Sequence, residues 1–212
     1  MNDGIFKSVS QGSGRKEDSE NHRIEEITHE LRRRCKLYEE ELGSSQADVY
    51  SIGTEQRIAE QFALENALWL PIAEVFQLGV PGPSGNENDT YVSNDLIYKV
   101  NNLLNVRGSI IKLMEKVLWH NYLFAETAYT FHGFTGFSGS SIMPIFKQNL
   151  IKNAVPATLI EIATYMAALG FNKVDEGRYT NDIYEVWDLL PRNVLKDTDG
   201  DIYVVDAEIK LK

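Results

Sequence analysis

The chain has 212 residues, and 43% of them are apolar, which is enough to bury one substantial core or two small ones. Its formal net charge is −10, with 21 basic and 31 acidic residues. Nucleic acid is therefore not expected as a main partner, because phosphate backbones are held by an excess of Lys and Arg. Cys35 is the only cysteine, which excludes an internal disulfide and a thiolate metal cluster.

The N-terminal residues 1–22 are mostly Ser, Gly, Asn and charged residues, and they predict a flexible tail. The polar residues after Met1 do not form a signal peptide. The longest weakly charged stretch, 154–171, includes Glu161 and predicts a buried helix instead of a membrane span. We therefore expect a soluble, cytoplasmic protein without a membrane partner.

Two helices are predicted before the first strand, so that residues 23–70 form an N-terminal helical segment. The apolar spacing from Ile24 to Leu42 predicts an amphipathic helix that ends at Gly43. A second helix is predicted over residues 54–69, with Thr54 as its N-cap. The run Arg32-Arg33-Arg34 is interpreted as a solvated helix face, with a phosphate-binding patch as the alternative. These helices offer a surface through which the protein could form oligomers.

From Pro71 the pattern changes to strands, predicted over residues 72–76, 90–92 and 96–100. A loop over residues 78–87 follows the first of them and contains Gly82 and Gly85. Glycines let backbone N–H groups approach phosphates closely, but two prolines remove donors from this loop, and a plain hairpin turn is the alternative. Lys99 lies on the third strand.

The middle of the chain predicts a long helix over residues 106–128, which carries Glu115 and Glu126, and two strands over 129–134 and 141–146. A buried helix is predicted from Pro156 to Leu169, with the proline in its first turn and Gly170 at its end. Residues 171–183 are expected to be irregular or to form a hairpin.

The most informative segment is Asp188-Leu189-Leu190-Pro191-Arg192-Asn193, followed by Asp206. The intervening residues predict a strand over 193–196, a turn over 197–200 and a return strand over 202–205. Asn193 and Asp206 would then lie at the open end of one hairpin, close enough to share a cation. A calcium loop from Asp197 to Glu208 is rejected, since its glycine is in the fourth position instead of the sixth.

These motifs resemble the protein-kinase-like superfamily, and in particular the compact polyvalent protein kinase domains of bacterial and mobile-element proteins. The resemblance covers roughly residues 53–208. It implies an α+β, protein-kinase-like two-lobe fold, preceded by the N-terminal helices. An antiparallel sheet would form the N-lobe over residues 71–148, and a truncated C-lobe would cover residues 149–212, because only six residues follow Asp206.

The resemblance also implies roles for the residues that match the kinase motifs. Asp188 would be the catalytic base, and Lys99 would hold the phosphates of ATP. Glu115 would orient Lys99, with Glu126 as the weaker candidate; alternatively, Glu115 is a surface partner of Lys112 or Lys116. Asn193 and Asp206 would be the Mg²⁺ ligands, and Glu208 would assist them. Gly82 and Gly85 would cover the phosphates. A hinge-like run over 143–148 would bind the adenine, with Phe146 in contact with it.

The sequence departs from the kinase pattern at three places. Val186-Trp187 replaces His-Arg, so control by a phosphorylated activation loop is not expected. Leu190 replaces a frequent Lys, and Ala207-Glu208 replaces Phe-Gly. The resemblance implies an ATP-dependent phosphotransferase that moves the γ-phosphoryl group of Mg-ATP to a hydroxyl of an unknown protein or small molecule. The alternative is an inactive pseudokinase that binds a nucleotide or a partner.

Overall fold

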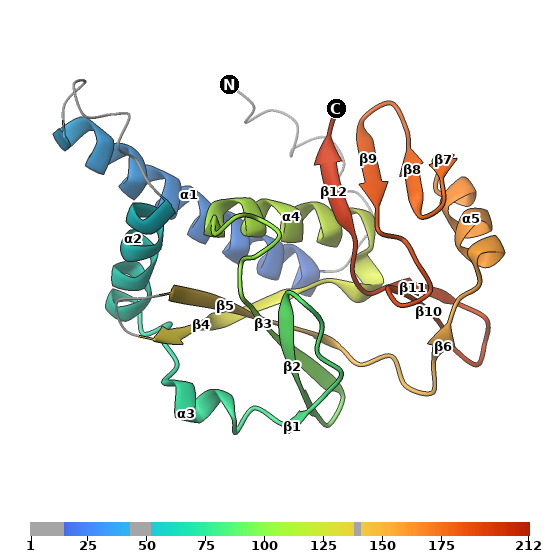
Figure 1. The fold of residues 1–212 in the computed structure, drawn as a ribbon, viewed down its shortest axis with the longest axis horizontal. Helices are drawn as coiled ribbons and strands as arrows, with labels where there is room; N and C mark the ends of the chain where they lie inside the picture. The colour runs from blue at the N-terminus through green and yellow to red at the C-terminus, as the bar shows by residue number, and fades with distance from the viewer. Residues whose placement is uncertain (1–14, 43–51, 138–140) are drawn as a thin grey trace.

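The computed structural model of the chain describes residues 15–42, 52–137 and 141–212. Its architecture is a mixture of helices and antiparallel sheets, so the predicted α+β class is confirmed (Figure 1). Two segments, each with its own buried core, follow one another along the chain.

The first segment is built around a five-stranded antiparallel sheet in the order β1-β2-β3-β5-β4. Lys99 lies in the central strand β3, opposite Thr90 on β2 and Phe146 on β5. A tight turn at Asn94, whose φ is 53°, joins β2 to β3. The strands are β1 (Val80–Pro81), β2 (Asn88–Ser93), β3 (Leu96–Asn101), β4 (Thr130–Phe137) and β5 (Ser141–Asn149).

Helices cover one face of this sheet, with α1 and α4 lying side by side (Figure 1). The side chain of Ser109 caps α4 by accepting a hydrogen bond from the Lys112 amide. Ile110, Met114 and Phe134 are fully buried where α4 meets the sheet and the N-terminal helices. The helices are α1 (Arg15–Leu42), α2 (Ile52–Glu65), α3 (Ile72–Val75), α4 (Ile110–Leu123) and a 3₁₀ turn, η2 (Ala125–Thr127).

The second segment contains one helix and two small sheets, ordered β11-β10-β6 and β12-β9-β8-β7. Thr158 and Glu161 form a reciprocal capping box that starts the helix α5. The core includes the fully buried Ile162, Met166 and Val186. The elements are β6 (Val155–Pro156), α5 (Leu159–Ala168), β7 (Asn172–Asp175), β8 (Arg178–Thr180), β9 (Tyr184–Trp187), β10 (Val194–Lys196), β11 (Ile202–Val204) and β12 (Glu208–Leu211).

Three local predictions are wrong. The first helix begins at Arg15, so the predicted tail is helical from that residue on; residues 1–14 lie outside the described residues. The strand predicted over 72–76 is the short helix α3 (Ile72–Val75) with its C-cap Phe76, because Pro71, with a φ of −54°, suits the residue that precedes a helix. Pro156 pairs with β10 as part of β6, and α5 begins after Thr158.

Other predictions agree with the structure. The two strands of the C-terminal hairpin are confirmed by the antiparallel register of β10 and β11. Residues 172–180 form the hairpin β7–β8, and Gly170 ends α5 with a φ of 81°. Within the described part of the chain, no helix is both long enough and apolar enough to cross a membrane.

Candidate active site

The hairpin β10–β11 brings Asn193 and Asp206 together. Val194 pairs with Val204 at the end of the ladder. Beyond that pair, the amides of Val205 and Asp206 both approach the carbonyl oxygen of Asn193, at 2.9 and 3.4 Å. The two candidate metal ligands are therefore fixed at the same end of one ribbon, where the sequence predicts them.

Asn193 is also tied to the candidate base Asp188. Its Nδ2 donates to the backbone carbonyl of Asp188 at 2.8 Å and to the carboxylate Oδ2 at 2.7 Å. Arg192 binds the other carboxylate oxygen in an exposed ion pair. Asp188 has a φ of 61°, a conformation that is uncommon for a residue with a side chain and that recurs at functional sites.

Lys99 reaches the same place from the five-stranded sheet. Its Nζ donates to the carbonyl of Val205 at 2.9 Å, directly beside Asp206, and to the hydroxyl of Tyr129 at 3.0 Å. The lysine is 8% exposed. Burial lowers the pKa of Lys99, and the nearby Asp206 carboxylate opposes that shift. The predicted phosphate-binding cation is thus adjacent to the predicted metal ligand.

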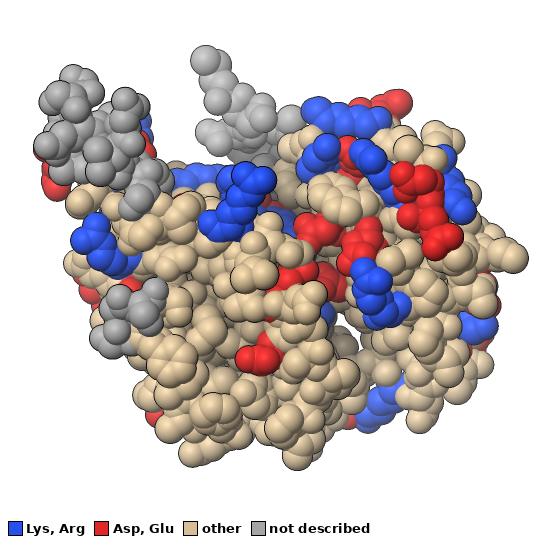
Figure 2. Space-filling model, viewed as in Figure 1, with Lys and Arg blue, Asp and Glu red and all other residues tan. Residues whose placement is uncertain are grey.

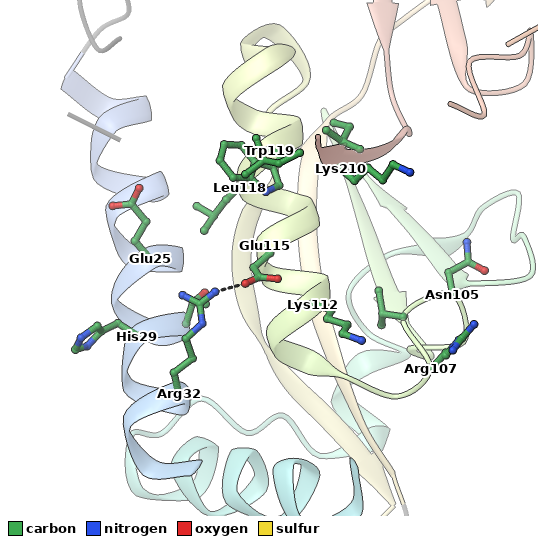
Figure 3. Close-up of a pocket in the computed structure, with 14 residues that line it drawn as sticks. Glu25, His29, Arg32, Asn105, Arg107, Lys112, Glu115, Leu118, Trp119 and Lys210 are labelled. Carbon is green, nitrogen blue, oxygen red and sulfur yellow. Dashed lines mark hydrogen bonds and ion pairs between the residues drawn. The ribbon is translucent and has the colours of Figure 1, made fainter. Parts of the chain in front are cut away.

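The predicted pair between Lys99 and Glu115 is not formed. Glu115 binds Arg32 on α1 instead (Figure 3), and both side chains are about half exposed. This ion pair borders a cavity of about 900 Å³ between α1, α4 and β12. The weaker candidate Glu126 lies in η2, beyond the end of α4. The partner of Glu115 is therefore neither Lys99 nor one of the two neighbouring lysines.

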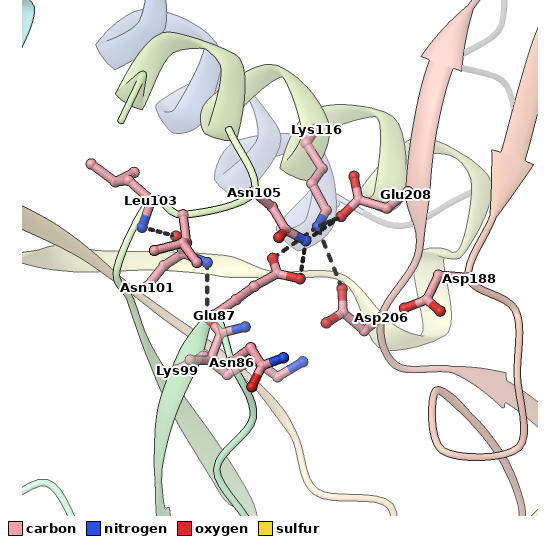
Figure 4. A network of polar contacts seen from close by, with 12 residues as sticks. Asn86, Glu87, Lys99, Asn101, Leu103, Asn105, Lys116, Asp188, Asp206 and Glu208 are labelled. Carbon is pink, nitrogen blue, oxygen red and sulfur yellow. Dashed lines mark hydrogen bonds and ion pairs between the residues drawn. The ribbon is translucent and has the colours of Figure 1, made fainter. Parts of the chain in front are cut away.

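The lysine that α4 directs toward the site is Lys116. Its Nζ lies 2.6 Å from Glu208 Oε1, 3.5 Å from Glu87 Oε2 and 3.8 Å from Asp206 Oδ1 (Figure 4). Burial alone would lower the pKa of Lys116, but the carboxylates of Asp206, Glu208 and Glu87 outweigh it and raise that pKa. Asn105 donates to Glu208 at 3.1 Å and also binds Glu87.

Acidic side chains gather in the middle of the face shown in Figure 2. Magnesium prefers oxygen ligands and is commonly held by one or two carboxylates together with substrate phosphates. Asn193 and Asp206 offer this kind of donor set. The Glu208 oxygen that faces the cluster already accepts two hydrogen bonds, from Asn105 and Lys116. Among the described residues, no group of three or more His, Cys, Asp or Glu side chains could hold a metal by itself.

The two loop glycines lie between β1 and β2 instead of after a strand over 72–76, and their amides are engaged within the hairpin. The N–H of Gly82 donates to Thr90 at 2.9 Å, and that of Gly85 donates to Asn88 at 3.1 Å. A Cβ on Gly82 would approach the Thr90 hydroxyl to 2.7 Å, so this glycine permits close strand packing. At the end of the loop, Glu87 reaches the Lys116 cluster.

The predicted hinge run 143–148 is the body of β5 instead of a segment between strands. Phe146 is 2% exposed and stands in register with Lys99 on one side and Phe131 on the other. It lines a small cavity together with Lys99 and Asp206. The hinge assignment is wrong because the chain leaves the sheet only after Asn149.

The sequence pattern gave no role in the site to several polar residues that the fold brings there, namely Lys116, Glu87, Asn105, Tyr129, Asn88, Asn101 and His120. Lys116 lies three residues after Leu113 and four before His120 on one face of α4, but the helix is apolar over too wide an arc for this spacing to fix its rotation. The sequence gives no comparable signal for Asn105 or Glu87, since both lie in loops that only the folded chain brings to α4.

The chain also matches a known protein family by sequence. A family model described as the serine/threonine/tyrosine kinase found in polyvalent proteins matches residues 53–212. A search of curated proteins found no match. Since the family model covers most of the chain, including Lys99, Asp188, Asn193 and Asp206, the protein belongs to the kinase family of polyvalent proteins.

Proposed function

We propose that the protein is a phosphotransferase that moves the γ-phosphoryl group of Mg-ATP to a hydroxyl acceptor. One observation carries the proposal: Lys99 donates to the carbonyl of Val205, so its ammonium lies beside Asp206. Asn193, whose carbonyl is approached by the amide of Asp206, holds Asp188. A cation, two oxygen ligands for a metal and a base thus come together from β3, the hairpin β10–β11 and the segment after β9.

In this proposal the four residues have separate tasks. Asn193 and Asp206 would hold Mg²⁺, which neutralises charge on the phosphates when it is bound. Lys99 binds phosphate oxygens and is held in place by Tyr129. Asp188 accepts a hydrogen bond from the acceptor hydroxyl and takes its proton as the oxygen attacks the γ-phosphorus and the bond to the β-phosphate oxygen breaks. Positioning and charge neutralisation supply most of the acceleration.

The surroundings of Asp188 leave room for an acceptor. A hollow of about 460 Å³ borders the carboxylate and is lined in part by Gly177, Trp187 and Leu190. We place the acceptor there, and the nucleotide on the side of Lys99. This division corresponds to a two-lobe kinase arrangement, in which the five-stranded sheet forms the N-lobe and the two small sheets with α5 form the C-lobe.

The second candidate function is a nucleotide-binding module without transfer activity. It is favoured by the missing acidic partner of Lys99, whose ammonium is held by a tyrosine and a carbonyl instead. The amides of Gly82 and Gly85 also favour this function, because they are hydrogen-bonded inside their hairpin.

One experiment separates these functions. The chain is incubated with γ-labelled ATP and Mg²⁺, alone and with a panel of protein and small-molecule hydroxyl acceptors. Nucleotide binding is followed in parallel by thermal shift. A phosphotransferase labels itself or an acceptor, and Asp188→Asn abolishes the label while ATP still binds. ATP binding without label in any reaction identifies the module, and no binding of ATP at all contradicts both functions.

A further inference from the structure

Lys116 lies where the site collects negative charge. Its ammonium is within 4.0 Å of three carboxylates that come from three separate places in the chain: Glu87 at the end of the glycine loop, Asp206 after β11 and Glu208 on β12. The side chain is only 13% exposed, and the three acids are between 20 and 27% exposed. Figure 4 shows Lys116 extending from α4 into this group.

A lysine ammonium and a divalent cation both neutralise the negative charge of carboxylates. Either one can therefore stabilise the same group of acidic side chains. The shortest contact, 2.6 Å to Glu208, is a charge-assisted hydrogen bond to the oxygen that Asn105 also binds. The contact to Asp206 is longer, at 3.8 Å, and is an ion pair without a hydrogen bond. Lys116 therefore holds Glu208 firmly and Asp206 only loosely.

We propose that the ammonium of Lys116 binds Glu208, so that this carboxylate does not coordinate the divalent ion of the active site. The same ammonium competes with that ion for Asp206. The inference rests on the proposed function, since it concerns the metal of the same site. It assigns Glu208 as the anchor of Lys116, so that the ion is bound by Asn193 and Asp206 alone. The bare protein then binds the ion weakly, because a positive charge stands beside its carboxylate ligand, and the phosphates of the nucleotide supply the missing negative charge.

The test is a titration of Mn²⁺, a paramagnetic substitute for Mg²⁺, into the nucleotide-free full chain, with free ion measured by electron paramagnetic resonance. Lys116→Met removes the ammonium and keeps the length of the side chain. We expect it to bind Mn²⁺ on the order of tenfold more tightly than the wild type. Lys112→Met is the matched control, because it removes the same charge from an exposed position on the same helix. It should differ from the wild type by less than about twofold.

A double variant identifies the withheld ligand. Glu208→Gln in the Lys116→Met background should return the Mn²⁺ affinity to about the wild-type value, because the released carboxylate is gone. The inference is overturned if Lys116→Met binds no better than Lys112→Met, or if the double variant keeps the whole gain.

The same titration distinguishes failure of the inference from failure of the proposed function. Asp206→Asn, alone and combined with Lys116→Met, should abolish Mn²⁺ binding. If it does so while Lys116→Met has no effect, only the role of Lys116 is wrong. If no variant binds Mn²⁺, or if Asp206→Asn changes nothing, the metal site itself is wrong and the proposed function fails with it.

Discussion

The amide nitrogen of Asn193 binds Asp188 twice, at the backbone carbonyl and at the carboxylate. This leaves the amide oxygen as the group that can take a cation, so one side chain orients the candidate base and offers a metal ligand. Asn193 therefore joins the positioning of the base to the binding of the metal, which the sequence motif assigns to different residues.

Replacing Asn193 by Ala should therefore affect both stability and activity. The variant removes both hydrogen bonds from Asn193 to Asp188, whose carbonyl then keeps the Leu190 amide as its donor. We expect the free energy of unfolding to fall by about 1–3 kcal/mol. Phosphoryl transfer should fall by about 100-fold or more through loss of the metal ligand and of the positioned base. Urea unfolding and the labelled-ATP assay measure the two effects. Arg192→Met, which breaks only the exposed pair with Asp188, should cost less than about 1 kcal/mol; an equal loss of stability in both variants would contradict the special role of Asn193.

Lys99→Met should weaken ATP binding without destabilising the fold. A charged hydrogen bond is worth about 1.5–3 kcal/mol, so we expect the dissociation constant of ATP to rise by roughly 10- to 100-fold. Among the described residues, no carboxylate lies within hydrogen-bonding distance of the buried ammonium, so an apolar side chain of similar length should change the free energy of unfolding by about 1 kcal/mol or less. Isothermal titration calorimetry and urea unfolding test the two statements. The exposed Lys173 on β7 provides the control, as Lys173→Met; ATP binding by Lys99→Met that matches this control would remove Lys99 from the phosphate site.

Glu115→Gln should leave phosphoryl transfer within about twofold of the wild type, because an exposed pair with Arg32 contributes at most about 1 kcal/mol and does not touch Lys99. Arg32→Gln should have an equally small effect. Transfer rates and the concentration of ATP at half-maximal rate provide the measurement. A large loss of activity confined to Glu115→Gln would show that this glutamate leaves Arg32 and joins Lys99 when nucleotide binds.

His120 should make the fold sensitive to acid. It is 1% exposed, and burial, followed by the nearby charge of Lys99, lowers its pKa from 6.5 to about 3. Below pH 6.5 the unfolded chain takes up a proton at this histidine, whereas the folded chain stays neutral there until about pH 3. The contribution of His120 to stability is therefore complete above pH 6.5 and is lost as the pH falls toward 3.

Urea unfolding across that range of pH measures this contribution. His120→Gln keeps a group that can hydrogen-bond to Thr127 but does not titrate, so it should flatten the pH dependence of the free energy of unfolding. His29→Gln, at an exposed position on α1, is the matched control. A slope in His120→Gln equal to that of the wild type would show that other groups cause the acid sensitivity.

Short-range patterns in the sequence were sufficient to predict the hairpin that carries Asn193 and Asp206. The strand, turn and return strand are neighbours along the chain, so their pairing follows from alternation and turn residues. The position of Lys99 on a strand followed in the same way. By contrast, the run 72–76 was too short for its period to separate a strand from a helix, and the structure forms α3 there.

The sequence by itself was enough to identify the four residues that match the kinase motifs, Lys99, Asp188, Asn193 and Asp206. Each of them lies on or beside an element whose secondary structure depends on nearby residues. Only the tertiary structure decided which side chain of α4 faces them. Consecutive helical residues point about 100° apart, and α4 is apolar over a wide arc, so its pattern does not fix its rotation. Packing against α1 fixes it: Glu115 meets Arg32, and Lys116, one position later, meets Asp206 and Glu208.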